Sequence, residues 1–402
     1  MDLKKIAISA LCVGLLFNLF FSGTVQGSQV VVSPALVQHD PTPSFTVNAK
    51  GAVLMEPLTG KIILEHNSHE ALPPASITKI MTLLLIYEAI EQGRINWDDM
   101  VTTSEYAARR GGSQIYLEAG EQQTVRDLTK AIAVASANDA AAAMAEFLAG
   151  SEEGFVANMN AKAAELGMRN TTFINSCGLH AEGHEMSAHD IALMSRALIT
   201  RYPEIHDLAT IWMDTIIHRT ARGEEVFGLT NTNRMLRTYQ GSNGLKTGFT
   251  SQAGFCISAT AQRDGLTLIA VILGSPDSAT RFDEARKLLD YGFANYTLAS
   301  GDPAGMDRGQ VMVNKGTLDS VGVVVKEQIS VVMAKGNHVR LDSRVELLDS
   351  LNAPVSAGTK AGEVIYISEG KEVGRSDLIV AEDIPRADLG HMMRRLINRW
   401  FV

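Results

Sequence analysis

Apolar residues recur along the chain with two different periods, and each period predicts a different element. Between residues 51 and 65, two short apolar runs flank the turn-prone segment Pro57-Leu58-Thr59-Gly60, which is typical of a strand, a turn and a strand. After Pro73-Pro74, apolar residues instead recur every three to four positions, as on one face of a helix. This helical spacing is found in residues 77–85, 125–148, 155–166 and 187–200. The pattern therefore predicts a β-hairpin followed by a block of helices.

Strands return after the helical block. Residues 254–262 and 266–273 are rich in apolar residues, and Arg263-Asp264-Gly265 between them is a signal for a tight hairpin. A last helix fits residues 282–296. Strands on both sides of a helical block predict an antiparallel sheet with helices packed on it, so we expect an α+β fold for residues 28–302.

The pattern changes after a stretch rich in Gly, Pro and Asp at residues 299–307. From there the apolar runs are short and β-branched, and glycines or polar turns separate them, as in a small all-β module. The runs are residues 311–313, 321–325, 329–333, 339–341 and 363–367. We therefore predict a domain boundary near residue 303 and a β-rich domain over residues 303–386.

The final segment, residues 387–402, is amphipathic. One side of a helix would carry Met392, Met393, Leu396, Ile397, Trp400 and Phe401, and the other side mostly Arg394, Arg395, Asn398 and Arg399. The segment is too short to span a bilayer, but it suits a helix lying in the headgroup region. The alternative is a helix docked on its own domain. The arginines beside Trp and Phe favour the membrane surface, so we predict a membrane-anchoring helix.

Residues 1–27 have the pattern of an export signal. Two lysines precede an apolar run over residues 6–21, and small residues follow, so we place cleavage near Gly27 or Ser28. The alternative is an N-terminal membrane helix that is retained. Cys12 lies early in the apolar run rather than at its end, which argues against a lipid-attachment site. We therefore expect an exported protein.

Charge and cysteine content narrow the possible partners. The formal net charge is −9, from 36 basic and 45 acidic residues, which argues against a nucleic-acid partner because no broad cationic face is available for phosphates. Beyond the signal, the chain has Cys177 and Cys256, and neither has a metal-type spacing. Free, partly buried thiols are the favoured interpretation, and one disulfide between them stays open. The sequence does not indicate an oligomeric state.

The segment Ser76-Ile77-Thr78-Lys79 begins the helical block. Because Ser76 and Lys79 are three residues apart, they would share a helix face, and the amine could approach the hydroxyl. A serine is a poor nucleophile without an adjacent base, and a lysine held out of water near other cations loses part of its affinity for a proton. The helix N-terminus would also direct backbone N–H groups at charge that develops nearby. This pattern predicts a nucleophile and its base.

Two further motifs could complete a site. Ser136-Ala137-Asn138 lies in a region of small residues, where the hydroxyl could relay a proton and the amide could bind a substrate carbonyl. Lys246-Thr247-Gly248 precedes the late hairpin, where Lys and Thr could bind a carboxylate and Gly would let a substrate backbone approach. The first two patterns are weak alone, because Ser368-Glu369-Gly370-Lys371 and Ser350-Leu351-Asn352 also match them in polar turns of the β-rich part. The stronger indication of a common site is that all three motifs occur in this order within one domain.

With this trio, the sequence resembles the low-molecular-mass penicillin-binding proteins that are serine D-alanyl-D-alanine carboxypeptidases of peptidase family S11. The resemblance covers residues 46–299 and extends to five further blocks: Gly111-Gly112-Ser113, Asn138-Asp139-Ala140, residues 175–179, Asn231-Thr232-Asn233 and residues 244–250. It implies a β-lactamase/transpeptidase-like domain with a helical subdomain, followed by a small all-β domain. One departure is Ala137, where the family often has glycine, and a methyl group there should be tolerated.

The resemblance also implies roles for the first two motifs. Ser76 would attack the carbonyl between the last two D-alanines of a peptidoglycan stem peptide and form an acyl-enzyme. Lys79 would be the general base. Ser136 and Asn138 would complete the proton relay and hold the peptide. β-Lactam antibiotics would be trapped on Ser76, and no metal or other cofactor would be needed.

For the third motif, the resemblance implies substrate binding. Lys246 and Thr247 would bind the terminal carboxylate, and Gly248 would allow close approach. The backbone N–H of Phe249 would form the oxyanion hole together with that of the nucleophile. Arg281 is similar to a family arginine that assists carboxylate binding, although a surface or helix-capping arginine is its ordinary alternative. The enzyme would then work at the outer face of the cytoplasmic membrane or in the cell wall.

Other functions stay open beside this one. A class A-like β-lactamase on the same fold needs a glutamate that activates the deacylating water, and no convincing block for it lies between the second and third motifs, although Glu165, Glu182 and Glu185 are near. DD-endopeptidase action by the same site cannot be separated by sequence. The intact motifs argue against a non-catalytic wall-binding protein.

A zinc site is a weaker hypothesis. His180, His184 and His189 crowd a short stretch, but His184 and His189 are five residues apart, which turns them off a common helix face. We therefore interpret them as loop histidines near the rim of the active site.

Overall fold

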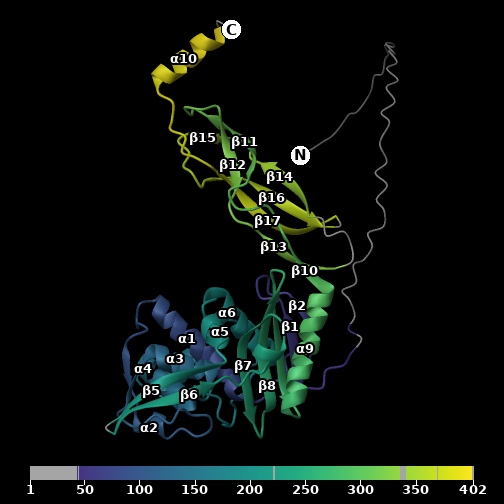
Figure 1. Cartoon of the computed structure of the whole chain (residues 1–402). Helices are drawn as coiled ribbons and strands as arrows, with labels where there is room; N and C mark the ends of the chain where they lie inside the picture. Colours follow the sequence, from purple (N-terminus) through teal and green to yellow (C-terminus); the bar gives the residue numbers. More distant parts are fainter. Residues whose placement is uncertain (1–42, 44, 221, 336–340, 369, 401–402) are drawn as a thin grey trace, which may run out of the picture. The chain divides into compact units, whose positions relative to one another are not determined.

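The computed structural model describes residues 43, 45–220, 222–335, 341–368 and 370–400 (Figure 1). The predicted export signal, residues 1–27, lies outside the described residues. The predicted α+β fold class is confirmed, because a sheet with helices packed on it is followed along the chain by an all-β part.

The first sheet has five strands in the order β2-β1-β9-β8-β7, and each neighbouring pair is antiparallel. Its strands are β1 (Gly51–Met55), β2 (Ile62–His66), β7 (Ser242–Thr250), β8 (Gly254–Arg263) and β9 (Leu266–Ser275). Both predicted hairpins are confirmed. Asp264 and Gly265 have φ angles of 49° and 80° between β8 and β9, as a two-residue type I′ turn requires. β7 forms one edge of the sheet.

Most of the predicted helices are confirmed, with bounds that differ by a few residues. In chain order, the helices before the C-terminal part are η1 (Ala75–Thr78), α1 (Lys79–Glu91), α2 (Glu105–Ala108), α3 (Val125–Val134), α4 (Asn138–Ala149), α5 (Glu152–Glu165), α6 (Ala188–Arg201), α7 (Ile205–Ala209), α8 (Met235–Thr238) and α9 (Ser278–Asn295). Thr124, Ser151, Ser187 and Asp277 cap four of them with a side-chain oxygen.

One helix prediction was wrong. Residues 125–148 form two helices, α3 and α4, rather than one. The break falls at Ser136, whose φ of 61° is incompatible with a right-handed helix. No glycine or proline marks the break, so the continuous apolar pattern concealed it.

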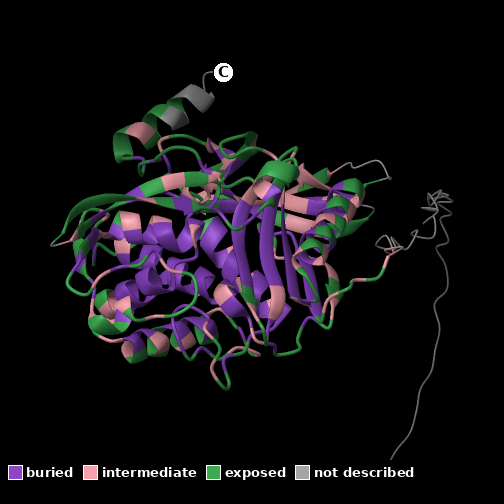
Figure 2. Cartoon of the chain, turned by 60° about the horizontal axis from the view of Figure 1, so that its bottom comes forward, coloured by how far each residue is buried: buried purple, intermediate pink, exposed green. Residues whose placement is uncertain are grey.

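Each face of the sheet has its own core, because successive residues of β1 point to opposite faces. Val53 and Met55 lie in the core that α1, α3, α4 and α6 share. Ala52 and Leu54 lie in the core that includes Phe282 of α9. Figure 2 shows the buried residues gathered in the sheet and in the helices packed on it. Since α1 is buried on nearly all sides, the residue that begins it, Lys79, is held away from water.

Two small two-stranded sheets before β7 were not predicted. They are β3 (Met100–Thr102) with β4 (Gln122–Thr124) and β5 (Met213–Thr220) with β6 (Gly223–Thr230). Most residues of β5 and β6 are exposed or half-buried, so these strands lack the apolar alternation that would reveal them.

The C-terminal part is all-β, as predicted. Its main sheet has the order β14-β16-β17-β12-β11-β15, and a second sheet pairs β10 with β13. The strands are β10 (Tyr296–Ser300), β11 (Asp307–Asn314), β12 (Ser320–Val325), β13 (Ser330–Ala334), β14 (Asp342–Leu347), β15 (Ser350–Asn352), β16 (Lys360–Ser368) and β17 (Lys371–Val380). Four of the predicted runs fall on strands; of the run at 339–341 only Leu341 is described, outside any strand. β10 precedes residue 303 yet pairs with β13 beyond it, and the boundary itself stays a prediction.

The chain ends in the helix α10 (Leu389–Trp400). Leu389, Met392, Met393 and Ile397 are exposed and recur at helical spacing, so α10 has an apolar face open to solvent. Within the described residues, no helix is both long enough and apolar enough to cross a bilayer.

Candidate active site

The first motif forms the tight turn η1 and the first residue of α1. Lys79 Nζ donates hydrogen bonds to Ser76 Oγ at 3.1 Å, to Asn138 Oδ1 at 2.6 Å and to the carbonyl of Cys177 at 2.7 Å. The amine therefore joins the predicted nucleophile to the second motif and to a loop further along the chain.

The environment of Lys79 shifts its protonation equilibrium toward the neutral form. Burial lowers the pKa of Lys79 to about 8, while the Cys177 side chain and the carboxylate of Asp139 oppose the shift. The guanidinium of Arg110 lowers it slightly further. An amine with this pKa is partly unprotonated near neutral pH and can accept the proton of a hydroxyl at 3.1 Å.

The second motif lies in the break between α3 and α4. Ser136 is buried, and within the described part of the chain its Oγ has no hydrogen-bond partner, so its donor and acceptor capacity is unused. Asn138 is fixed on both sides of its amide group: its Nδ2 donates to the carbonyl of Gly111 at 2.6 Å, and its Oδ1 accepts from Lys79. The left-handed turn at Ser136 thus brings a free hydroxyl beside a rigid amide.

A buried carboxylate holds the loop that supports Asn138. Asp139 accepts hydrogen bonds from the backbone N–H groups of Ile115 and Leu117. Burial raises the pKa of Asp139 even though these bonds oppose the shift. The same loop supplies the carbonyls of Gly111 and Ser113, which accept hydrogen bonds from the side chain and the backbone N–H of Asn138.

The third motif lies on the edge strand β7, directly against the first. A Cβ built on Gly248 would lie 3.0 Å from the backbone nitrogen of Ser76 and 3.0 Å from the carbonyl oxygen of Pro74. No other described strand pairs with the outer edge of β7, so an extended peptide could add to it there. The spatial convergence of the three motifs, expected from their order alone, is therefore present.

Lys246 is the second buried amine of the site. Its Nζ donates to the carbonyl of Thr247 at 3.1 Å. Burial lowers the pKa of Lys246 well below its usual value, and the charges of Lys79 and Arg281 lower it further. A carboxylate arriving here would gain a charge partner and relieve this mutual repulsion.

Thr247 has a hydroxyl neighbour that we did not predict as a site residue. Thr232 Oγ1 lies 2.6 Å from Thr247 Oγ1. The flanking side chains fix this segment, because Asn231 Nδ2 donates to the carbonyls of Ala209 and Ile211 and Asn233 Nδ2 donates to the carbonyl of Gly244. The only signal in the sequence was the block Asn231-Thr232-Asn233.

Phe249 lies on β7, and Arg281 lies on α9, from which its side chain reaches the backbone of β7 and β8. Arg281 is buried, and its Nη1 donates to the carbonyls of Gly248 at 3.1 Å and Cys256 at 3.3 Å. Burial lowers the pKa of Arg281 to about 10, so it stays charged at neutral pH. The ring of Phe249 is half-exposed and packs on Phe255 with centroids 4.3 Å apart. Arg281 thus supports β7 from behind.

The loop after Thr172 contributes backbone groups to the site, which cannot be predicted from the types of residue in the sequence. The carbonyl of Cys177 contacts Lys79, and Gly178 with φ 83° lies against Ala75. A backbone carbonyl is available at every position, so only the fold selects this one. Cys177 and Cys256 are both free and buried, which answers the open question of a disulfide.

The three histidines are not brought together around a metal, and only His180 and His184 lie in this loop, because His189 is the second residue of α6. Both ring nitrogens of His184 are hydrogen-bonded, to Thr78 and to Ile174, and His189 packs on another histidine ring. Across the described residues, no group of three or more His, Cys, Asp or Glu is arranged to hold a metal ion.

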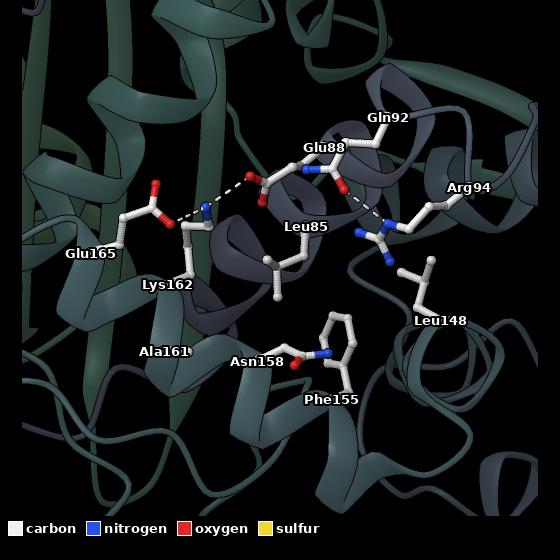
Figure 3. Close-up of a pocket in the computed structure, with 10 residues that line it drawn as sticks. All are labelled: Leu85, Glu88, Gln92, Arg94, Leu148, Phe155, Asn158, Ala161, Lys162 and Glu165. Atoms are coloured by element: carbon white, nitrogen blue, oxygen red, sulfur yellow. Dashed lines mark hydrogen bonds and ion pairs between the residues drawn. The ribbon is translucent and has the colours of Figure 1, made fainter.

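A separate pocket of about 330 Å³ opens among the helices (Figure 3). Lys162 of α5 lies in its wall, where it donates to Glu88 of α1 at 2.8 Å and to Glu165 at 2.5 Å. The lining residues are Leu85, Glu88, Gln92, Arg94, Leu148, Phe155, Asn158, Ala161, Lys162 and Glu165. None of the predicted site residues is among them. The Lys162–Glu88 ion pair joins α5 to α1, whereas the Lys162–Glu165 pair lies within α5.

Comparison with known proteins identifies the two parts of the chain. The family described as D-alanyl-D-alanine carboxypeptidase, peptidase family S11, matches residues 36–277. The domain described as penicillin-binding protein 5, C-terminal domain, matches residues 297–386. The D-alanyl-D-alanine carboxypeptidase DacF of Bacillus subtilis is 39% identical over 360 residues, which cover 89% of this chain and 92% of the relative. DacC of Escherichia coli is 34% identical and covers 84% of this chain and 85% of its own.

Solved structures agree with this assignment. Penicillin-binding protein 5 of Haemophilus influenzae has 31% identity and a TM-score of 0.72, and the match covers 86% of this chain and 100% of the other. A penicillin-binding protein of Streptococcus pneumoniae, described as a peptidoglycan synthesis regulatory factor (PBP3), has 32% identity and a TM-score of 0.72 over 85% of this chain and 100% of its own. The chain belongs to peptidase family S11, the D-alanyl-D-alanine carboxypeptidases of the penicillin-binding protein type.

Proposed function

We propose that this carboxypeptidase removes the terminal D-alanine of peptidoglycan pentapeptides through an acyl-enzyme on Ser76. The observation that carries the proposal is the contact of Lys79 Nζ with the Ser76 hydroxyl at 3.1 Å, made by an amine whose pKa burial lowers to about 8. Ser76 Oγ attacks the carbonyl carbon between the last two D-alanines, and its proton passes to Lys79 Nζ. A tetrahedral intermediate forms.

Collapse of this intermediate requires a proton for the leaving amine. Ser136 is suited to relay it from Lys79: its hydroxyl gives a proton to the leaving amine and regains one from Lys79 Nζ, which took it from Ser76. The Ser136 Oγ is buried, has no other partner in the described chain and belongs to the motif whose Asn138 contacts Lys79. The carbon–nitrogen bond breaks, D-alanine leaves with the proton, and the acyl group remains on Ser76. Water then attacks the ester, Lys79 and Ser136 transfer the protons in the reverse order, and Ser76 is released.

The carboxylate and oxyanion sites use the edge of β7. Lys246 and Thr247 bind the terminal carboxylate, and the N–H groups of Ser76 and Phe249 bind the oxyanion. Gly248 lies between Thr247 and Phe249, close enough to Ser76 that a Cβ at this position would push the two backbones apart by a few tenths of an ångström. Arg281 assists through its hydrogen bond to the Gly248 carbonyl and its positive charge near Lys246.

β-Lactams are expected to acylate the same serine. A penicillin-binding protein D2 of Listeria monocytogenes, 32% identical with a TM-score of 0.52, has been solved with ampicillin bound. Labelled penicillin should modify the wild type covalently, at Ser76 by peptide mass, and should leave Ser76→Ala unlabelled. Ser368→Ala is the matched control, since Ser368 and Lys371 repeat the spacing of the first motif at the ends of β16 and β17. Equal labelling of Ser76→Ala and wild type would contradict the proposal.

Release of D-alanine from diacetyl-Lys-D-Ala-D-Ala measures the activity directly. The β-lactamase alternative is not favoured by the family match. Turnover of nitrocefin faster than release of D-alanine would reverse that ranking.

Endopeptidase action on cross-links remains a second activity that the same site could perform, and it is assayed with a cross-linked muropeptide.

We further propose that the protein is exported and rests on the membrane surface. The pattern of residues 1–27 supports export, since the substrate lies outside the cytoplasm. The exposed apolar face of α10, with Met393 and Ile397, supports attachment in the headgroup region.

A further inference from the structure

His184 is buried beside the turn that carries the nucleophile, and the chemistry above does not use it. Its Nδ1 lies 3.0 Å from the backbone nitrogen of Ile174, and its Nε2 lies 2.8 Å from Thr78 Oγ1. A backbone N–H can only donate, so Nδ1 is the acceptor, and the ring hydrogen is on Nε2. Burial lowers the pKa of His184 to about 4, against the charge of Glu152 and with that of His180, so the ring is neutral at physiological pH.

Thr78 links His184 to the turn by a second hydrogen bond. Since Nε2–H donates to Thr78 Oγ1, the threonine hydroxyl is free to donate to the carbonyl of Ala75, at 2.9 Å. Ala75 has a φ of 50°, a left-handed conformation that is unfavourable for a residue with a Cβ and needs support from its surroundings.

The carbonyl of Ala75 and the N–H of Ser76 belong to one peptide group. Because a peptide group is planar, fixing its oxygen fixes the direction of its N–H. That N–H is one of the two proposed oxyanion-hole donors. The loop that carries His184 is also held close to this peptide: a Cβ on Gly178 would be 1.9 Å from the Ala75 oxygen and 2.8 Å from Thr78 Oγ1.

We propose that His184 is a positioning residue that orients the Ser76 N–H in the oxyanion hole through Thr78 and the Ala75 carbonyl. The inference rests on the proposed function, because the oxyanion appears only if Ser76 is acylated. It predicts that loss of the Nε2–H donor slows acylation and deacylation while non-covalent binding of the β-lactam changes little, since the oxyanion forms only in the transition state.

Two substitutions at this position separate the two ring contacts. The side-chain oxygen of asparagine takes about the place of Nδ1, so His184→Asn keeps an acceptor for Ile174 N–H and loses the donor to Thr78. Glutamine reaches the place of Nε2, so His184→Gln keeps the donor to Thr78 and loses the acceptor. Stopped-flow acylation by a chromogenic β-lactam gives the dissociation constant and the acylation rate constant separately, and a thermal melt gives Tm.

Acylation by His184→Asn should be slower than wild type by about tenfold, less than the loss from deleting a donor outright, and His184→Gln should acylate within about threefold of wild type. Wild-type acylation by His184→Asn would overturn the proposal. Equal slowing of both variants in step with a lower Tm would also overturn it, because His184 would then only hold its loop. Failure of the wild type to acylate would instead contradict the proposed function.

Substitutions of Thr78 test the same hydrogen bonds without changing a residue of the loop that carries His184. Thr78→Val has the same shape without the hydroxyl and should slow acylation as much as His184→Asn does. Thr78→Ser keeps the hydroxyl and should acylate at about the wild-type rate. The double variant His184→Asn with Thr78→Val should acylate no more slowly than either single variant, because both substitutions interrupt the same series of hydrogen bonds. Additive losses, or wild-type acylation by Thr78→Val, would refute the relay.

Discussion

Gly248 lies against the backbone of Ser76, so that a Cβ at position 248 would be 3.0 Å from the Ser76 nitrogen. Two segments far apart in the sequence meet here, the edge strand β7 and the turn η1. The separation between the substrate-binding strand and the nucleophile is thus set by the absence of one side chain.

Gly248→Ala should therefore displace β7 by a few tenths of an ångström and slow acylation. Misplacement of reacting groups by up to 1 Å costs about 100-fold in rate, so we expect a loss of between about tenfold and 100-fold. Stopped-flow acylation by a β-lactam measures it. Gly228→Ala on β6 is the control, since a Cβ there meets no atom within 4 Å. Equal rates for wild type and Gly248→Ala would show that the strand yields freely.

The acylation rate should rise with pH and level off above an apparent pKa of about 8. The base form of Lys79 is the unprotonated one, and its pKa is lowered to about 8, so activity is lost as pH falls below that value. Deprotonation of Lys246, whose pKa is also lowered, should appear separately as weaker binding of the substrate carboxylate. Rate constants and dissociation constants measured from about pH 6 to about pH 10 distinguish the two. A flat rate profile would exclude Lys79 as the base.

Sequence periodicity predicted the elements that are strongly apolar. The strands β8 and β9 and the helices α5 and α6 were predicted within a few residues, because their apolar spacing and turn or cap residues agree. The strands β5 and β6 were missed because few of their residues are buried.

The motifs predicted which residues meet, but not the backbone that positions them. The left-handed residues Ala75 and Ser136 are both non-glycine, and nothing in their sequence neighbourhood predicts a positive φ. The carbonyl of Cys177 is a partner of Lys79 that only the folded loop could select. Thr232 was visible as part of a block, yet its contact with Thr247 depends on how the flanking asparagines are bonded.

Asp139→Asn should destabilise the protein and slow acylation together. The Asp139 carboxylate accepts from the backbone N–H groups of Ile115 and Leu117, and an asparagine would turn a donor toward one of them. Loss of such a buried acceptor costs about 2 kcal/mol in the free energy of unfolding, which urea denaturation measures. Asp98→Asn should be neutral, because that side chain is 89% exposed and its ion pair with Arg126 is at the surface. Equal stability of the two variants would mean that other contacts hold the loop.

The apolar face of α10 makes the membrane proposal testable without touching the active site. Met393 and Ile397 are 55% and 53% exposed, and burying both side chains in the headgroup region would gain roughly 1.5 to 3 kcal/mol for the pair. Met393→Glu with Ile397→Glu should therefore lower sedimentation with anionic lipid vesicles by more than about tenfold, with release of D-alanine from a soluble peptide unchanged. Met312→Glu on β11 is the control, because that apolar side chain is 58% exposed but lies outside the helix. Binding that survives the double substitution would assign attachment to another surface, and a wild type that does not sediment would leave α10 without a membrane role.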